Sequence, residues 1–171
     1  MDPDRFSELY RRHHRAVWAY AVRRLPGGAD AADVAAEVFA VAWRRRDELP
    51  AEPETVLWLY GTARRVVANA NRAAGRRDRL TGRLASLRDS REPGILPEGH
   101  PEVLAALDRL GPNEREAIRL AVWEDLAVRD IARVLGCSPN AVSLRLARAR
   151  KRLGAELAHL MTVPYEERRT R

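Results

Sequence analysis

The sequence has little cysteine, and this excludes two common ways of stabilising a small protein. Cys137 is the single cysteine among 171 residues. An internal disulfide and a multi-cysteine zinc site are therefore excluded. Cys137 falls in a predicted turn, where a small buried apolar residue is more frequent than a reactive thiol.

Motifs for catalysis and for cofactor binding are also missing. The chain has no Gly-rich phosphate loop, no histidine ligand set and no nucleophile–base arrangement. His13 and His14 are adjacent, so on a helix they point in different directions and do not form a ligand pair. We therefore expect no catalytic residue, no metal and no cofactor, and the sequence does not predict an enzyme.

The sequence also lacks long apolar runs. No apolar stretch approaches the roughly 18 residues that a membrane-spanning helix needs. The first residues are charged and amphipathic, unlike a secretory signal peptide. The expected protein is cytoplasmic and is not inserted in a membrane.

Basic residues, in contrast, are abundant. Arg and Lys number 31 against 24 Asp and Glu, which gives a formal net charge of +7. Lys151 is the lone lysine, so nearly all of this charge is arginine, whose planar fork suits phosphate and guanine. The balance favours a polyanionic partner. An arginine bias together with abundant alanine also follows from a GC-rich genome.

Helical periodicity dominates the chain, and strand signals are nearly absent. We therefore predict an all-α fold. Apolar residues at helical spacing and turn residues between them place the helices at about 6–25, 29–46, 54 to beyond 75, 102–110, 112–123, 128–135 and 138–160.

A segment with little periodicity divides the predicted helices into two groups. Residues 89–101 contain three prolines and two glycines, a composition typical of a linker. We expect two small helical domains, 1–88 and 101–161, joined by a flexible linker at 89–100. Residues 162–171 are expected to be a disordered tail.

The stretch 128–152 predicts a helix-turn-helix whose second helix is basic. Gly136 permits a left-handed residue after the first helix. Ser138 can cap the next helix, and Pro139 fits its first turn. The outward face of that helix, free to meet a DNA major groove, comprises Asn140, Ser143, Leu144, Ala147 and Arg148. The alternative is a core helix with a solvated basic side.

Charge is segregated in the first half of the chain. Residues 25–63 carry seven carboxylates and three arginines, whereas residues 64–91 carry nine arginines and two aspartates. This asymmetry suggests two different partners. Asp30, Asp33 and Glu37 share one helix face, although a merely solvated acidic face would look the same.

The basic part includes a polar row at helical spacing, which could stack on bases and bind phosphates. Its members recur every three or four residues: Trp58, Thr62, Arg65, Asn69, Arg72 and Arg76. Trp58, taken alone, also fits a half-buried packing residue.

These motifs, in this order, resemble an extracytoplasmic-function (ECF) sigma factor, a bacterial RNA polymerase specificity subunit. The resemblance covers about residues 5–158. It is carried by the segments 6–10, 30–43, 58–69, 107–116 and 128–152. It implies a protein that directs core polymerase to specific promoters and helps to open the minus-ten element. The C-terminal domain would read the minus-thirty-five element.

The resemblance also implies roles for individual residues. The set expected to bind core polymerase is Asp30, Asp33, Val34, Glu37, Val38 and Phe39. The set expected at the minus-ten element is Trp58, Arg64, Arg65, Asn69, Arg72 and Arg76, with a loop at about 47–54 that captures an unpaired base. The set expected at the minus-thirty-five element is Ser138, Asn140, Ser143, Leu144, Arg145, Arg148, Arg150 and Lys151.

The implied partners are core RNA polymerase, through its β′ clamp and β subunit, promoter DNA, and an anti-sigma factor. Thr62 departs from the family pattern, which usually has an aliphatic residue there. Ser143-Leu144 stands where a cation followed by serine is frequent; Leu144 can contact a thymine methyl group but cannot read a donor/acceptor pattern. The alternatives are a free-standing helix-turn-helix regulator that binds an operator as a dimer, and an adaptor protein.

Overall fold

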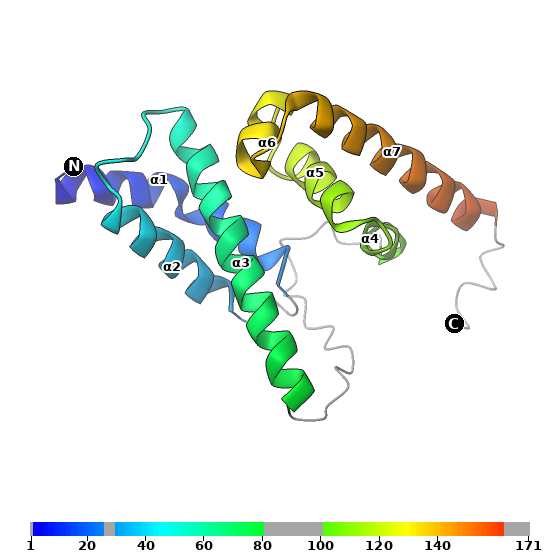
Figure 1. The fold of residues 1–171 in the computed structure, drawn as a ribbon, viewed down its shortest axis with the longest axis horizontal. Helices are drawn as coiled ribbons and strands as arrows, with labels where there is room; N and C mark the ends of the chain where they lie inside the picture. Colours follow the sequence, from blue (N-terminus) through cyan, green and yellow to red (C-terminus); the bar gives the residue numbers. More distant parts are fainter. Residues whose placement is uncertain (1, 26–29, 81–100, 163–171) are drawn as a thin grey trace. The chain divides into compact units, whose positions relative to one another are not determined.

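A computed structural model describes residues 2–25, 30–80 and 101–162. All the regular structure in these ranges is helical, which confirms the all-α prediction (Figure 1). The elements are α1 (Pro3–Val22), α2 (Ala31–Arg44), α3 (Glu54–Leu80), α4 (Pro101–Asp108), α5 (Pro112–Val122), α6 (Val128–Leu135) and α7 (Pro139–Thr162). Within the described ranges, no helix combines the length and the apolar character that a membrane span requires.

The chain forms two compact units, Met1–Leu96 and Pro97–Arg171. The predicted linker at 89–100 lies outside the described residues, as does nearly all of the predicted tail at 162–171. The predicted domain limits therefore stay predictions.

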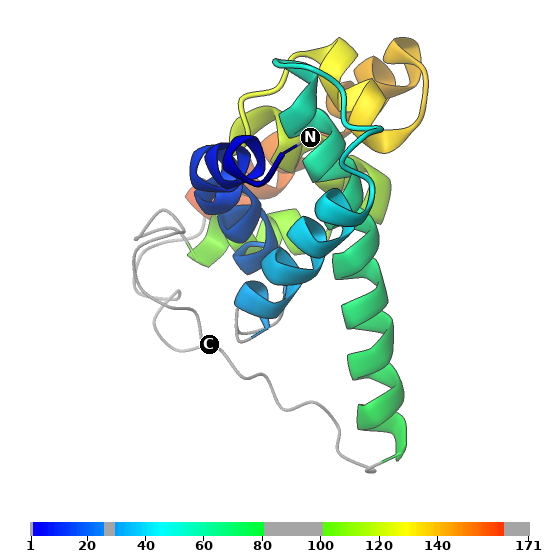
Figure 2. The same ribbon diagram turned by 90° about the vertical axis from the view of Figure 1, so that its left-hand side faces the viewer.

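In the first unit, α1, α2 and α3 pack on one another around a small apolar core. Val17, Val38 and Leu59, one from each helix, are fully buried. Asp2 caps α1 by accepting a hydrogen bond from the backbone N–H of Arg5 at 2.9 Å, and this bond holds the pKa of Asp2 below its usual value. The last turns of α3 extend past α2, as two views show (Figures 1 and 2).

In the second unit, α4 to α7 enclose their own core, with Leu120, Ile131 and Val142 fully buried. The turn between α6 and α7 has the expected chemistry. Gly136 adopts φ 65° and ψ 42°, the left-handed conformation. The Ser138 hydroxyl accepts a hydrogen bond from the N–H of Ala141 at 3.2 Å, so the predicted cap is confirmed.

Candidate functional site

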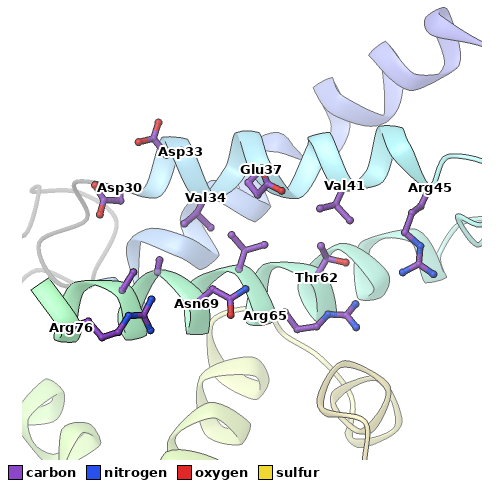
Figure 3. A pocket seen from close by; sticks show the side chains of 13 residues that line it. Asp30, Asp33, Val34, Glu37, Val41, Arg45, Thr62, Arg65, Asn69 and Arg76 are labelled. Carbon is purple, nitrogen blue, oxygen red and sulfur yellow. The ribbon is translucent and has the colours of Figure 1, made fainter.

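A groove of about 840 Å³ runs between α2 and α3, and both charged helix faces that the sequence predicted meet in it. We call it the α2–α3 groove. Figure 3 shows the α2 side chains along one side and the α3 side chains along the other. It is lined by Asp30, Asp33, Val34, Glu37, Val41, Arg45, Thr62, Arg65, Val66, Asn69, Ala70, Ala73 and Arg76.

The acidic rim of the groove consists of Asp30, which directly precedes α2, and of Asp33 and Glu37 on α2, and all three are exposed. Glu37 accepts a hydrogen bond at 2.9 Å from Arg44, which lies two helical turns further along α2. Asp30 and Asp33 form no ion pair within the described residues. Asp30 and Asp33 therefore present uncompensated negative charge to solvent, as a docking face for a cationic partner would.

The three apolar residues that were expected to bind polymerase are buried, and Val34 alone among them lines the groove. Val34, Val38 and Phe39 are at most 4% exposed, and the Phe39 ring packs against the ring of Tyr10 at 4.7 Å between centroids. Val34 and Val38 are four residues apart and Phe39 follows directly, so all three fall on the buried face of α2. They hold the helix in place, and the carboxylates on its other side are what a partner can reach.

The basic rim of the groove comes from α3. Arg65, Asn69 and Arg76 are exposed and line it, while Arg64 is half-buried to one side. Arg72, next to the rim, donates a hydrogen bond to the Asn69 side-chain oxygen. Among the residues that the structure describes, no ion pair joins the acidic rim to the basic rim. Two partners of opposite charge can therefore approach neighbouring faces.

Thr62 differs from the sequence expectation. It was placed in the outward row with Arg65, but it is only 3% exposed, under α2 at the floor of the groove. Its hydroxyl oxygen is buried and has no hydrogen-bond partner in the described part of the chain. Helical spacing alone makes the row continuous, but α2 covers Thr62.

The segment between α2 and α3 is held by short local contacts. Arg45 donates to Glu48 at 3.1 Å, which lowers the pKa of Glu48 and raises that of Arg45. The Thr55 hydroxyl donates to the carbonyl of Pro50 at 2.7 Å. Trp58, at the start of α3, is half-buried with the Arg45 guanidinium 5.8 Å from its ring centroid. A half-buried Trp58 with a cation over its ring fits the packing interpretation.

In the second unit, α7 presents its predicted outward face to solvent. Asn140, Ser143, Leu144 and Arg148 are all exposed, as is the capping Ser138. The Ser143 hydroxyl donates to the backbone carbonyl one turn earlier at 3.1 Å. The opposite face of the helix is buried, with Val142, Leu146 and Ala149 at most 3% exposed.

The cations of α7 fall into two groups. Arg148, Arg150 and Lys151 are exposed, with no ion-pair partner among the described residues. Arg145 is half-buried and donates to the Cys137 sulfur at 3.3 Å. Arg152 pairs with Glu114 of α5 at 2.7 Å, so it fastens α7 to the unit. Arg148, Arg150 and Lys151 therefore carry positive charge that no carboxylate of the described residues neutralises.

An apolar groove of about 200 Å³ also lies within the second unit, formed by α4, α5 and the middle of α7. Its lining is Val103, Leu104, Leu107, Ile118, Arg119, Val122, Trp123 and Leu153. Val122 at its edge is 66% exposed, which is unusual for a side chain beside a core.

Two protein families match the chain, one in each unit. Residues 9–77 match sigma-70 region 2, and residues 100–153 match sigma-70 region 4. The first range holds the α2–α3 groove, and the second holds the helix-turn-helix.

Curated relatives match over almost the whole chain. The RNA polymerase sigma factor CarQ of Myxococcus xanthus is 31% identical over 163 residues, which are 92% of this chain and 91% of CarQ. The ECF RNA polymerase sigma factor SigM of Mycobacterium tuberculosis is 29% identical over 159 residues, covering 92% of this chain and 79% of SigM.

Solved structures share the fold. The sigma factor RpoE of Bartonella quintana, solved in complex with the anti-sigma factor NepR, matches with a TM-score of 0.74 and 24% identity, over 90% of this chain and 96% of that one. CnrH, solved with the cytosolic domain of CnrY, matches with a TM-score of 0.66 and 23% identity, over 92% and 90%.

Proposed function

The chain belongs to the ECF sigma factors, which direct core RNA polymerase to promoters, and we propose that the two rims of its α2–α3 groove divide this work. The acidic rim faces the polymerase, and the basic rim faces the minus-ten DNA. The observation that carries the proposal is the absence, among the described residues, of any ion pair between the rims. Each charge set is thereby left available for an external partner.

On the acidic rim, Asp30, Asp33 and Glu37 are the contacts with the β′ clamp. Exposed carboxylates attract a cationic surface and exclude DNA, whose phosphates they repel. The Glu37–Arg44 pair is exposed, so exchanging Arg44 for a cation of the clamp costs little. Val34, Val38 and Phe39 contribute indirectly, by fixing the orientation of α2.

On the basic rim, Arg65, Asn69, Arg72 and Arg76 bind the phosphates and base edges of the minus-ten element, and Arg64 flanks them. The loop at 47–54, together with Trp58, receives a base taken out of the duplex. Unpairing a base costs a few kcal/mol, which stacking and a fitted pocket can offset. The positive charge of α3 keeps the separated strand in place.

In the second unit, α7 reads the minus-thirty-five element in the major groove. Ser143, Leu144 and Arg148 face base edges, and Asn140 and Ser138 lie at the N-terminal end that enters the groove first. Arg150 and Lys151 bind phosphates. Arg145 has a smaller share in DNA binding than the sequence suggested, because it already donates to Cys137.

Further contacts of the chain are with proteins. We infer that the apolar groove around Val122 serves the β subunit, because its lining offers little charge for DNA and an exposed apolar edge for a protein. We also infer an anti-sigma factor that competes for these surfaces, and action in the cytoplasm beside the polymerase. We expect no catalytic step from this chain.

Joining the two DNA-binding units raises affinity through effective concentration. Each interface is modest by itself, and both become tight when core polymerase holds them at promoter spacing. A free-standing dimeric regulator is not favoured, because it has no use for the unit that matches sigma-70 region 2.

The experiment is in vitro selection with core RNA polymerase. Core enzyme, with and without the purified protein, transcribes a DNA library randomised at the minus-ten and minus-thirty-five elements. We expect transcription that depends on the protein, and the templates transcribed in its presence should be enriched in one sequence at each element. Enrichment at one element only, or transcription that does not depend on the protein, would contradict the proposal.

A further inference from the structure

A buried histidine on α1 is joined to the loop between α2 and α3. The Nε2 atom of His13 lies 2.6 Å from the Oε1 atom of Glu52. His13 is 8% exposed, whereas the Glu52 side chain is 42% exposed. The two residues are 39 positions apart, so no local element brings them together.

The carboxylate of Glu52 is held from a second side as well. The Arg12 guanidinium lies 3.9 Å from the same oxygen, and Arg12 is itself bonded to Glu8 at 3.4 Å. A charged acceptor strengthens the hydrogen bond from a buried donor. The Glu52 carboxylate is therefore held by the buried His13 imidazole on one side and by the Arg12 guanidinium on the other.

Residues 50–55 form a compact turn with Glu52 in its middle. The Thr55 hydroxyl donates to the Pro50 carbonyl at 2.7 Å, and the N–H of Glu54 donates to the Ala51 carbonyl at 3.0 Å. These bonds set the internal shape of the turn. The side chain of Glu52 connects that turn to α1, so it sets the orientation of the turn relative to the helices.

The same carboxylate forms part of a cavity of about 520 Å³ between α1 and the loop, which Arg12, Arg46 and Asp47 also line. Displacing Glu52 would change the wall of this cavity. The loop is the segment to which we assign capture of the unpaired minus-ten base. Its orientation therefore matters for promoter opening more than for binding to the polymerase.

We propose that His13 is a positioning residue for promoter opening, acting through Glu52 to hold the α2–α3 loop in the orientation that receives the unpaired base. This inference rests on the proposed function of the loop. The group that acts is the imidazole Nε2, which donates to the carboxylate. A side chain with an amide donor at similar reach should replace it in part, and an apolar one should not.

The test uses the holoenzyme, assembled from core polymerase and the full chain, on the promoter obtained by the selection above. The non-template strand carries 2-aminopurine at single minus-ten positions, so that its fluorescence reports unstacking. Closed-complex affinity and opening rate are measured separately. The variants are His13→Leu, His13→Gln, Glu52→Ala and the double variant His13→Leu/Glu52→Ala.

We expect His13→Leu and Glu52→Ala each to slow opening roughly tenfold, the size that loss of one hydrogen bond to a charged group produces. His13→Gln should recover most of the rate, and the double variant should be no slower than either single one. Core affinity and closed-complex affinity should stay unchanged. Glu8→Gln is the matched control, because Glu8 lines the same cavity and pairs with Arg11 and Arg12, and among the described residues it forms no hydrogen bond or ion pair with the loop.

A merely structural role for His13 would give a different pattern, with reduced stability and equal losses in core binding and opening, and this would overturn the proposal. Glu52→Ala changes a partly exposed loop residue, so it keeps the test valid if His13→Leu does not fold.

The double variant Arg65→Ala/Arg76→Ala distinguishes failure of the proposed function from failure of the positioning role. If it leaves opening unchanged, the assignment of α3 to the minus-ten element fails. If it slows opening while the His13 and Glu52 variants do not, the positioning role alone fails.

Discussion

At the scale of single residues, the buried hydroxyl of Thr62 is an unfavourable group that the fold tolerates. Burying a hydroxyl without a partner costs free energy that a methyl group of similar shape avoids. Thr62→Val should therefore raise the free energy of unfolding by about 1 kcal/mol. Thr55→Val is the matched control, because that hydroxyl donates to Pro50, and its loss should lower the stability by a similar amount. Urea unfolding followed by circular dichroism measures both. Destabilisation by Thr62→Val would show that the hydroxyl has a partner.

Two neighbouring cations on α7 are predicted to differ in their use. Arg148 lies on the face directed to base edges, so Arg148→Ala should cost roughly 1–3 kcal/mol and relax the preference at one minus-thirty-five position. Arg150→Ala should weaken binding to all sequences about equally and reduce the dependence on salt. Binding to a panel of single-base promoter variants at two salt concentrations distinguishes these outcomes. Identical sequence profiles for the two variants would refute the division of roles.

Residue roles could be predicted where the signal is local. Gly136 and Ser138 act within one turn of chain, and the structure confirms both. The burial of Thr62 depends on α2 above it, and the contact between His13 and Glu52 joins residues far apart in sequence. Periodicity reports the faces of one helix at a time, so it predicts neither the burial of Thr62 nor the contact between His13 and Glu52. Nothing local in the sequence around His13 indicates Glu52 as its partner.

At the scale of elements, the turn between α6 and α7 depends on backbone conformation more than on packing. A Cβ added to Gly136 would meet nothing within 4 Å, so Gly136→Ala costs only the strain of φ 65°. We expect a loss of about 1 kcal/mol in the free energy of unfolding.

Gly154 is the matched control, since it lies inside α7 and a Cβ there also meets nothing within 4 Å. Gly154→Ala should stabilise the protein by about 0.5–1 kcal/mol, because alanine favours a helix interior. Thermal unfolding of the two variants in parallel gives the comparison. A gain in stability from both substitutions would mean that the turn does not require a left-handed residue.

Helix identities followed from the sequence much better than helix ends. The stretch predicted at about 6–25 forms α1 over Pro3–Val22, and the stretch predicted at 29–46 forms α2 over Ala31–Arg44, whereas the prediction that the third helix continues beyond 75 is confirmed, since α3 runs to Leu80. Helix ends depend on caps and on contacts with other segments, which periodicity does not report. For the same reason the sequence identified both charged faces but not the groove that brings them together.

At the scale of the whole molecule, the separation of the two DNA-binding units is predicted to depend on residues 89–100, which lie outside the described part of the chain. If this segment sets the reach between units, its length matters more than its side chains. A Gly/Ser replacement of equal length should preserve transcription from the selected promoter. Deleting about half of it should abolish transcription at the normal spacing. Full activity of the shortened protein on the same promoter would contradict this role.

The proposed division of labour between the two rims of the α2–α3 groove separates polymerase binding from promoter opening. It is tested most directly by the equilibrium affinity for core polymerase of two charge-reversal variants, Asp33→Lys/Glu37→Lys and Arg65→Glu/Arg76→Glu. All four residues are exposed, and exposed substitutions typically change stability by under about 0.5 kcal/mol, so unchanged helix content is the control. We predict that the first variant loses core affinity and that the second keeps it while failing to open the promoter. Full core affinity in a folded Asp33→Lys/Glu37→Lys protein would contradict the account.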